Sequence, residues 1–140
     1  MKRVVTPELL DSDAGTPKEV SDSLADLRGI NQKFGGISTT QAMIEHVWRR
    51  GLPRQMSLLE VGAGSGDVPL TARTRLAAKG LSLQVTLLDR AATHLATGNN
   101  HQVVVGNALA LPFAAESFDL VSCGLFAHHL SPEEVVQFVK

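Results

Sequence analysis

The sequence predicts an α/β fold, in which a doubly wound parallel sheet of about four strands follows an N-terminal helical segment. Short apolar runs alternate with helical stretches from Met56 onward, and three glycines stand directly behind the first run. Continuous apolar strands in such an alternation are typical of a parallel sheet that helices cover on both faces. The preceding residues have helical periodicity. We therefore expect residues 1–54 to form a helical cap and residues 55–140 to form the α/β core.

The composition fits one globular domain. The chain has 140 residues, of which 44% are hydrophobic and 19% charged, and its formal net charge is −1. A chain of this length can bury a sizeable core. The 13 basic residues are scattered along the sequence, whereas nucleic-acid binding usually needs a basic stripe. We therefore expect no nucleic-acid partner.

The cysteine content and the length of the apolar runs indicate the cellular compartment. Cys123 is the only cysteine, which excludes an intrachain disulfide framework and a zinc cluster built on cysteines. No apolar run approaches the roughly 18 residues of a membrane span, and the first residues lack a signal-peptide pattern. We expect a cytoplasmic protein without a metal site or a membrane contact.

Two helices are predicted in the N-terminal segment. Residues 21–36 place four apolar side chains on one helix face, and residues 38–51 carry a second apolar stripe that we interpret as core. The members of these two groups are Leu24, Leu27, Ile30 and Phe34, and then Met43, Ile44, Val47 and Trp48. Arg28 and Asn31 could reach a ligand from this segment, although a solvated helix face is the simpler interpretation.

The core segment is predicted to alternate between strands and helices. The strands are expected at 57–61, 81–89, 101–108 and 118–126, and the helices at 66–80, 90–97 and 131–140. Pro69 falls in the first turn of its helix, where a missing N–H does no harm. Ser131 is the expected cap of the last helix, with Pro132 at its first position.

Three glycines, Gly62, Gly64 and Gly66, follow the first strand in a G-x-G-x-G pattern. Each glycine in a folded segment costs roughly 0.5–1 kcal/mol relative to alanine. Their clustering indicates a backbone that approaches something closely, or a tight strand–helix turn where a side chain would clash. The dinucleotide fingerprint G-x-G-x-x-G/A would place Asp67 where a small residue is needed, which disfavours NAD or FAD. The triphosphate-binding pattern G-x-x-x-x-G-K-[ST] is not present.

Two acids flank this glycine loop. Glu60 precedes it by two residues, and a carboxylate there would repel a pyrophosphate but suits a cationic ligand. Asp89 ends the second strand, about 20 residues beyond the glycines, where an acid can accept the hydroxyls of a ribose. A nucleoside with a cationic amino-acid tail would satisfy both carboxylates.

Four stretches in this order, LLEVGAGSGDVPL, VTLLDR, GNALALPF and FDLVSCGLFAHHLSPEEVVQFV, resemble the class I S-adenosylmethionine-dependent methyltransferases. The resemblance covers about residues 56–140 and is closest to the enzymes that act on small molecules such as quinones, phenols and polyketides. It implies a Rossmann-like methyltransferase fold, S-adenosylmethionine as cofactor, S-adenosylhomocysteine as product, and a phenolic, quinone or polyketide-like methyl acceptor.

The resemblance also implies roles for the residues near the first two strands. The loop of Gly62, Ala63, Gly64 and Gly66 would lie beside the methionine part of the cofactor. Glu60 would anchor the amino group, directly or through water. Asp89 would accept the ribose hydroxyls, and Arg90 would lie next to the adenine.

The third and fourth strands supply the remaining implied contacts. Asn107 and Ala108 resemble the Asp-Ala pair that reads the adenine, although asparagine stands here where aspartate is commoner. Its carbonyl oxygen can still accept a hydrogen bond from the adenine amine. Cys123 and Gly124 end the fourth strand, where a backbone carbonyl would meet the cofactor amine, and the Cys123 side chain itself is expected in the core.

His128 and His129 are the candidate catalytic residues. A histidine pair at a strand end could act as a general base. In the resembled family, however, histidine at this place often only packs or hydrogen-bonds to the next helix. Methyl transfer is an in-line displacement that mainly requires alignment, so the reaction needs a base only when the nucleophile still carries its proton.

The resembled fold has seven strands, whereas this sequence stops after the helix that follows the fourth. The core is therefore expected to be incomplete, with the apolar fourth strand as an exposed edge. Exposed edges pair with other chains, which predicts self-association. Two functions remain open, a methyltransferase and a truncated cofactor-binding or structural module without turnover. A dehydrogenase is disfavoured by Glu60 and Asp67.

Overall fold

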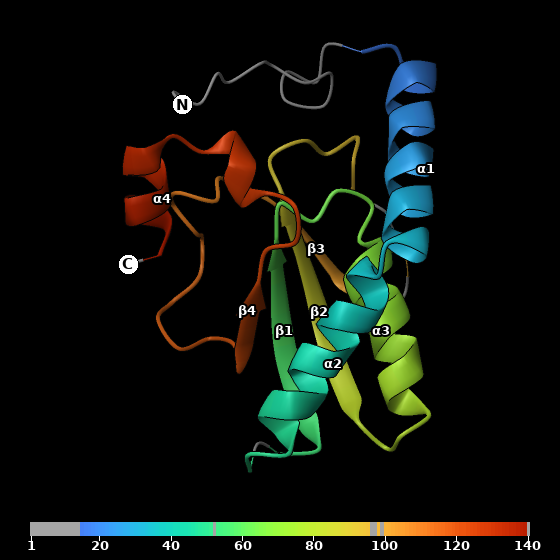
Figure 1. Cartoon of the computed structure of the whole chain (residues 1–140). Coiled ribbons are helices and arrows are strands. Elements are labelled where there is room, and N and C mark those ends of the chain that lie inside the picture. The colour runs from blue at the N-terminus through green and yellow to red at the C-terminus, as the bar shows by residue number, and fades with distance from the viewer. Residues whose placement is uncertain (1–14, 52, 96–97, 99, 140) are drawn as a thin grey trace.

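Four parallel strands form one sheet in the order β3-β2-β1-β4 (Figure 1). A computed structural model describes residues 15–51, 53–95, 98 and 100–139. The strands are β1 (Gln55–Val61), β2 (Ser82–Asp89), β3 (Gln102–Val105) and β4 (Leu120–Ser122). The expected α/β fold with a parallel sheet of about four strands is confirmed.

The order of the strands reverses at β1. The chain runs outward from β1 to β2 and β3, then returns to place β4 on the other side of β1. Glu60 of β1 therefore has Leu87 of β2 as one neighbour and Ser122 of β4 as the other. Ligands of open α/β sheets bind where the order reverses in this way, which is here between β1 and β4.

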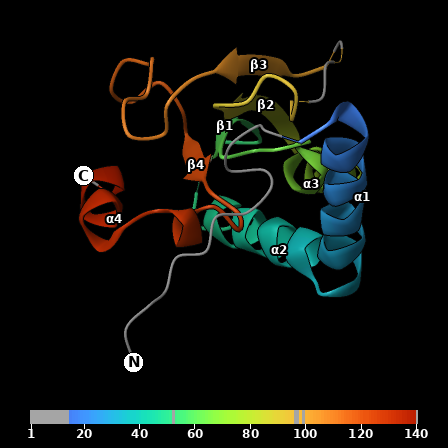
Figure 2. The same ribbon diagram turned by 90° about the horizontal axis from the view of Figure 1, so that it is seen from above.

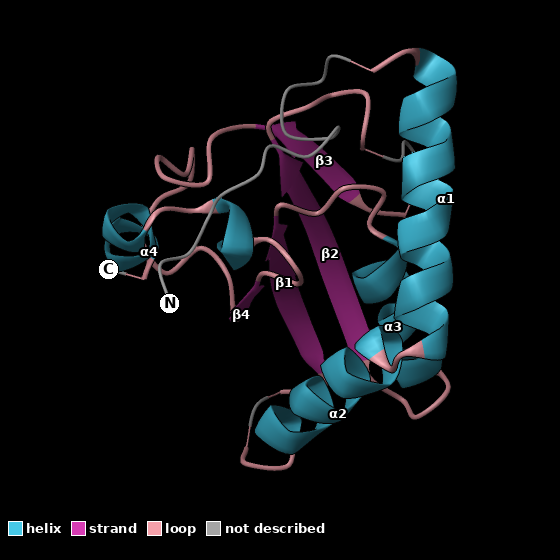
Figure 3. Cartoon of the chain, turned by 45° about the horizontal axis from the view of Figure 1, so that its top comes forward, coloured by secondary structure: helices cyan, strands magenta, loops and turns pink. Residues whose placement is uncertain are grey.

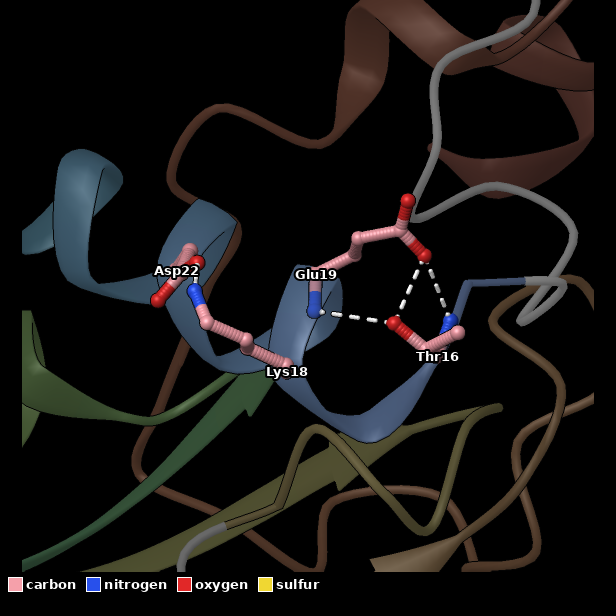
Figure 4. Close-up of polar contacts among 4 residues, drawn as sticks. All are labelled: Thr16, Lys18, Glu19 and Asp22. Carbon is pink, nitrogen blue, oxygen red and sulfur yellow. Dashed lines mark hydrogen bonds and ion pairs between the residues drawn. The ribbon is translucent and has the colours of Figure 1, made fainter.

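Helices α1 (Pro17–Lys33) and α2 (Gly36–Trp48) precede the sheet, and α3 (Asp67–Ala77) connects β1 to β2. A capping box begins α1: the Thr16 hydroxyl accepts a hydrogen bond from the Glu19 amide at 3.3 Å, and the Glu19 carboxylate accepts one from the Thr16 amide at 2.8 Å (Figure 4). Such caps contribute about 1 kcal/mol. None of the described helices is long and apolar enough to cross a membrane.

The last helix, α4 (Pro132–Phe138), follows a short 3₁₀ turn, η2 (Ala127–His129). Ser131 and Glu134 form a second capping box there, and Pro132 occupies the first turn. The expected start of this helix is confirmed.

Two apolar clusters cover the two faces of the sheet. On one face, α2 and α3 pack against β1 and β2, and Ile44 and Leu76 lie among the buried strand residues. Figure 2 shows α2 lying across this face. On the other face, Leu59, Val61 and Leu88 pack against a group from the β3–β4 loop, the end of β4 and α4. The partly buried aromatic members of this group are Phe113, Phe118, Phe126 and Phe138.

The helix expected at residues 90–97 is wrong over its described part. Residues 92–94 form a turn instead, and residues 96 and 97 lie outside the described part. The Asp89 carboxylate accepts a hydrogen bond from the Ala91 amide at 3.0 Å, and the His94 amide donates to the Ala91 carbonyl at 3.2 Å. These bonds close one turn, which the described residues do not continue into a helix.

The two N-terminal apolar stripes are only partly buried. Val20 is the buried residue of α1, whereas Phe34 at its end is 82% exposed. In α2, Ile44 is buried but Met43 is 64% exposed. The expectation that the whole second stripe is core is therefore wrong for Met43. Because Ile44 joins the core cluster of β1 and β2, part of the predicted cap covers the sheet directly.

Candidate functional site

The loop between β1 and α3 has a backbone shape that requires glycine at three positions. Gly62, Gly64 and Gly66 have φ angles of +65°, +52° and +70°, values that residues with a Cβ rarely adopt. Two of them also lack space for a side chain. A Cβ on Gly62 would lie 2.5 Å from the ring of Phe126, and one on Gly66 would lie 2.4 Å from Leu87. The loop therefore packs tightly against Phe126 and Leu87.

Asp89 joins two of the loops at this edge. Its Oδ2 accepts a hydrogen bond from the Gly64 amide at 2.9 Å, and its Oδ1 accepts one from the Ala91 amide at 3.0 Å. The buried His94 places its Nδ1 3.6 Å from the same Oδ1. A carboxylate offers about four acceptor sites. Asp89 thus has acceptor capacity beyond its bonds to the two amides, as a ribose ligand requires.

Glu60 is buried between β1 and β4, with a relative exposure of 4%. Its Oε1 accepts a hydrogen bond from the Gly124 amide at 2.8 Å, and its Oε2 accepts one from the Ser122 hydroxyl. Burial raises the pKa of Glu60, while both hydrogen bonds oppose that rise. A buried carboxylate with a raised pKa is suited to receive a cationic group, because a nearby positive charge would favour its ionised form.

The end of β4 lies beside Glu60. Gly124 lies close to Glu60, since a Cβ on it would be 3.4 Å from Oε1. Cys123 is half-buried and packs in the second apolar cluster. Burial, and then the charge of Glu60, raise the pKa of the Cys123 thiol. Its sulfur therefore behaves as a packing group, as expected from the sequence.

The loop after β3 lies beside Asp89. The Gly106 amide donates to the Asp89 carbonyl at 2.9 Å. Asn107 follows, exposed, with its Oδ1 accepting a hydrogen bond from the Leu109 amide at 2.9 Å. Ala108 is half-buried against the second cluster. Arg90 is exposed next to Asp89. The structure thus brings the residues predicted from the third strand to the same edge as the glycine loop.

His128 and His129 lie on the η2 turn after β4. Their ring centroids are 3.9 Å apart, and that of His129 is 6.3 Å from Phe126. Phe126 also packs on Gly62, so it connects the histidine pair to the glycine loop. Catalysis by either histidine remains a prediction.

Two residues of the predicted cap have different surroundings. The Arg28 Nε donates to Asp67 Oδ2 at 2.9 Å, so this side chain reaches the glycine loop. Asn31 lies in the last turn of α1, where its Oδ1 would be 2.7 Å from a Cβ on Gly36. The sequence interpretation of Arg28 as part of a solvated face missed its ion pair. The sequence analysis also missed Ser122. Pairing of the first strand with the fourth places its hydroxyl opposite Glu60.

Two grooves lie elsewhere on the described surface. Shallow grooves lie on the outer faces of α2 and α1, lined by Ser38, Thr39, Ala42, Met43, His46 and Val47, and by Ala25, Asp26, Gly29, Ile30, Lys33 and Phe34. Neither groove includes a residue of the glycine loop. Within the described residues, no group of three or more histidine, cysteine or acidic side chains could hold a metal ion.

Figure 3 shows the loops that follow the strands at one end of the parallel sheet. A glycine loop and two carboxylates lie at the switch in strand order, where open α/β sheets bind their ligands. Residues 58–140 match the family model described as a methyltransferase domain. This match covers more than half of the chain, and the chain therefore belongs to the methyltransferase domain family.

Three solved structures have a similar fold. A Methanococcus maripaludis protein assigned as an S-adenosyl-L-methionine-dependent methyltransferase is 14% identical, with a TM-score of 0.55 and coverage of 84% of this chain and 57% of that one. Phosphoethanolamine N-methyltransferase 1 of Haemonchus contortus, in complex with phosphoethanolamine and S-adenosylhomocysteine, is 18% identical, with a TM-score of 0.51 and coverage of 91% and 30%. A methyltransferase of calicheamicin biosynthesis, in its S-adenosylhomocysteine-bound form, is 22% identical, with a TM-score of 0.50 and coverage of 95% and 40%.

At these identities the likeness shows the fold alone. The chain spans between 30% and 57% of the lengths of these three structures. No curated protein matches the chain.

Proposed function

We propose that this chain binds S-adenosylmethionine and forms the cofactor-binding part of a methyltransferase for a small molecule. The observation that carries the proposal is the Asp89–Gly64 hydrogen bond. It holds a carboxylate that is free to accept further hydrogen bonds against a loop built from three left-handed glycines. Membership of the methyltransferase domain family and the S-adenosylhomocysteine complexes of two similar structures support the same cofactor.

Each part of the cofactor finds a partner of suitable chemistry at this edge. The cationic amino group would approach the buried Glu60 carboxylate, and the ribose hydroxyls would donate to Asp89. The glycine loop would lie beside the amino-acid part. Asn107 and Ala108 would read the adenine, with Arg90 beside it. The backbone of Cys123 and Gly124 would complete the wall next to the cofactor amine.

The cofactor supplies a methyl group that is already activated by the sulfonium charge. The protein's main tasks are therefore to align the acceptor with that methyl and to exclude water. An acceptor that keeps its proton also needs a base, and His128 and His129 are the candidates for that role. A phenolic, quinone or polyketide-like acceptor is the class that the motif resemblance favours.

A second candidate is a cofactor-binding module without turnover. It is favoured by the site itself, because the glycine loop, Glu60 and Asp89 can hold a cofactor without a catalytic base. The two candidates share the cofactor site and differ in methyl transfer.

The first test is a calorimetric titration of the whole chain with S-adenosylhomocysteine. Asp89→Ala should weaken binding by on the order of 2–4 kcal/mol, because hydrogen bonds to the ribose are lost. Asp119→Ala is a matched control: that carboxylate accepts hydrogen bonds from the amide and hydroxyl of Ser57, both at 2.7 Å, away from the glycine loop. Equal affinities for folded Asp89→Ala and for wild type would refute the proposal.

Turnover with a panel of phenols and quinones then separates the two candidates. Transfer of labelled methyl to any of them, lost in Asp89→Ala, would establish an enzyme. Binding without transfer across the panel would favour the module.

A further inference from the structure

Arg28 reaches the glycine loop from a helix that lies outside the sheet. Its Nε donates to Oδ2 of Asp67 at 2.9 Å, across 39 positions of the sequence. Asp67 is the first residue of α3 and directly follows Gly66. The Ser65 hydroxyl donates to the same Oδ2. A side chain of α1, a side chain of the loop and the first residue of α3 therefore meet at one carboxylate oxygen.

Leu24 gives α1 a second contact with this loop. It precedes Arg28 by one helical turn, so both side chains lie on the same face of the helix. Its Cδ2 lies 3.8 Å from the position of a Cβ on Gly64. The Gly64 amide in turn donates to Asp89. A series of contacts thus connects α1, through Gly64, to Asp89, the residue proposed to bind the ribose.

We propose that Arg28 is a positioning residue, which holds α1 against the glycine loop through Asp67 and keeps the loop in the shape that receives the amino-acid part of the cofactor. This inference rests on the proposed function. Glycine-rich backbone loses more conformational freedom on ordering than any other. A loop that is already ordered before the ligand binds loses less conformational entropy on binding, so the affinity is higher. Arg28 acts through Asp67.

The exposure of the ion pair sets the expected size of the effect. The Arg28 side chain is 50% exposed and that of Asp67 is 27% exposed. Partly exposed pairs are weakened by water and salt. We therefore expect losses of roughly three- to fivefold in affinity, and a smaller effect in 1 M salt than in dilute buffer.

A double-mutant cycle on the whole chain tests this proposal. Arg28→Gln and Asp67→Asn should each weaken S-adenosylhomocysteine binding by about three- to fivefold, and the double variant should be no weaker than either single one. Affinity for 5′-methylthioadenosine, which has the nucleoside but not the amino-acid part, should fall by a smaller factor than that for S-adenosylhomocysteine. A residue that only stabilises the fold would affect both ligands alike.

A matched control lies on the same helix. Lys18 and Asp22 form an exposed ion pair at 2.6 Å, one turn into α1 (Figure 4). Lys18→Gln removes that pair without touching the loop, and its S-adenosylhomocysteine affinity should equal that of wild type. Leu24→Ala is an uncharged second variant, which should weaken S-adenosylhomocysteine binding in dilute buffer and in 1 M salt alike.

Three results would overturn the proposal. They are an unchanged S-adenosylhomocysteine affinity in Arg28→Gln, additive losses in the double variant, or an equal loss of 5′-methylthioadenosine binding. Each of these leaves the proposed function standing if wild type binds S-adenosylhomocysteine. A folded wild type that does not bind would instead overturn both.

Discussion

The Asp89 carboxylate accepts the amide hydrogen of Gly64 across 2.9 Å, joining the end of β2 to the loop that follows β1. Gly64 has a left-handed backbone, with φ at +52°, a conformation that residues with a Cβ rarely adopt. The residue proposed to read the ribose and the loop proposed to hold the amino-acid part are therefore one hydrogen-bonded unit. A change at either partner is expected to affect cofactor binding.

Gly66→Ala should destabilise the fold by about 2–3 kcal/mol, measured by chemical denaturation. Its φ of +70° disfavours a Cβ, and the new methyl would lie 2.4 Å from the fully buried Leu87. Gly29→Ala is the control, because Gly29 is inside α1 and has nothing within 4 Å of its Cβ position. That change should stabilise by about 0.5–1 kcal/mol. Equal stabilities for the two variants would contradict this account of the loop.

The buried Glu60 carboxylate predicts a pH dependence of stability. Its pKa is raised above the ordinary 4.5 by burial, against the opposing hydrogen bonds of Ser122 and Gly124. A raised folded-state pKa means that this group's contribution is fully present below pH 4.5 and is lost as the pH rises through the folded value. Glu60→Gln should remove this dependence, so that the variant gains stability relative to wild type as the pH rises from 4 to about 7. Thermal denaturation across pH 4 to about 7 measures the difference; a variant that keeps the wild-type profile would exclude Glu60 as its source.

The same substitution should weaken ligand binding. The cationic amino group of S-adenosylhomocysteine would lose a charged acceptor in Glu60→Gln, and hydrogen bonds to charged groups contribute about 1.5–3 kcal/mol. We expect a loss of affinity of roughly tenfold or more, with 5′-methylthioadenosine unaffected because it lacks that amino group. Retention of full affinity by a stable variant would show that the amino group lies elsewhere.

Asn107 offers a test of the adenine contact. Asn107→Asp keeps an oxygen that accepts from the Leu109 amide and supplies an acceptor for the adenine amine. It should leave S-adenosylhomocysteine affinity unchanged or slightly higher in an equilibrium titration. Asn107→Leu removes the single side-chain acceptor, Oδ1, and should lower affinity several-fold. If Asn107→Leu binds as tightly as wild type, the adenine is not read at this position.

The exposed strand β4 predicts self-association. Within the described residues it pairs only with β1, and Val121 on it is 59% exposed. A lysine on an edge strand opposes pairing between chains, so Val121→Lys should lower the associated fraction in light scattering. Val136→Lys on α4, where Val136 is 53% exposed, controls for added charge. A wild type that stays monomeric at high concentration would contradict the prediction.

The strands and the glycine loop could be predicted because their signals are local. A continuous apolar run defines a buried parallel strand, and the spacing of Gly62, Gly64 and Gly66 places a turn directly behind it. The acids at Glu60 and Asp89 then reach one edge of the sheet, because parallel strands end on the same side. The fold and the set of residues near the candidate site follow from these patterns.

The remaining features depend on contacts between distant residues. The sequence predicts a helix over 90–97, but its described residues close only a turn, in which the His94 amide donates to the Ala91 carbonyl. The Arg28–Asp67 pair spans 39 positions, and the sequence contains no local sign of it. The apolar stripe of α2 includes Met43, whose exposure depends on how the helix packs and not on its periodicity.

The most direct test is a nuclear magnetic resonance titration of ¹⁵N-labelled chain with S-adenosylhomocysteine, in which glycine amides serve as probes. The account predicts saturable shifts at Gly62, Gly64, Gly66 and Gly124, and unchanged signals from Gly29 in α1 and Gly51 beyond α2. Saturable binding whose shifts fall away from the glycine loop, or a folded chain with no shifts at all, would contradict the claim that this edge of the sheet is a cofactor site.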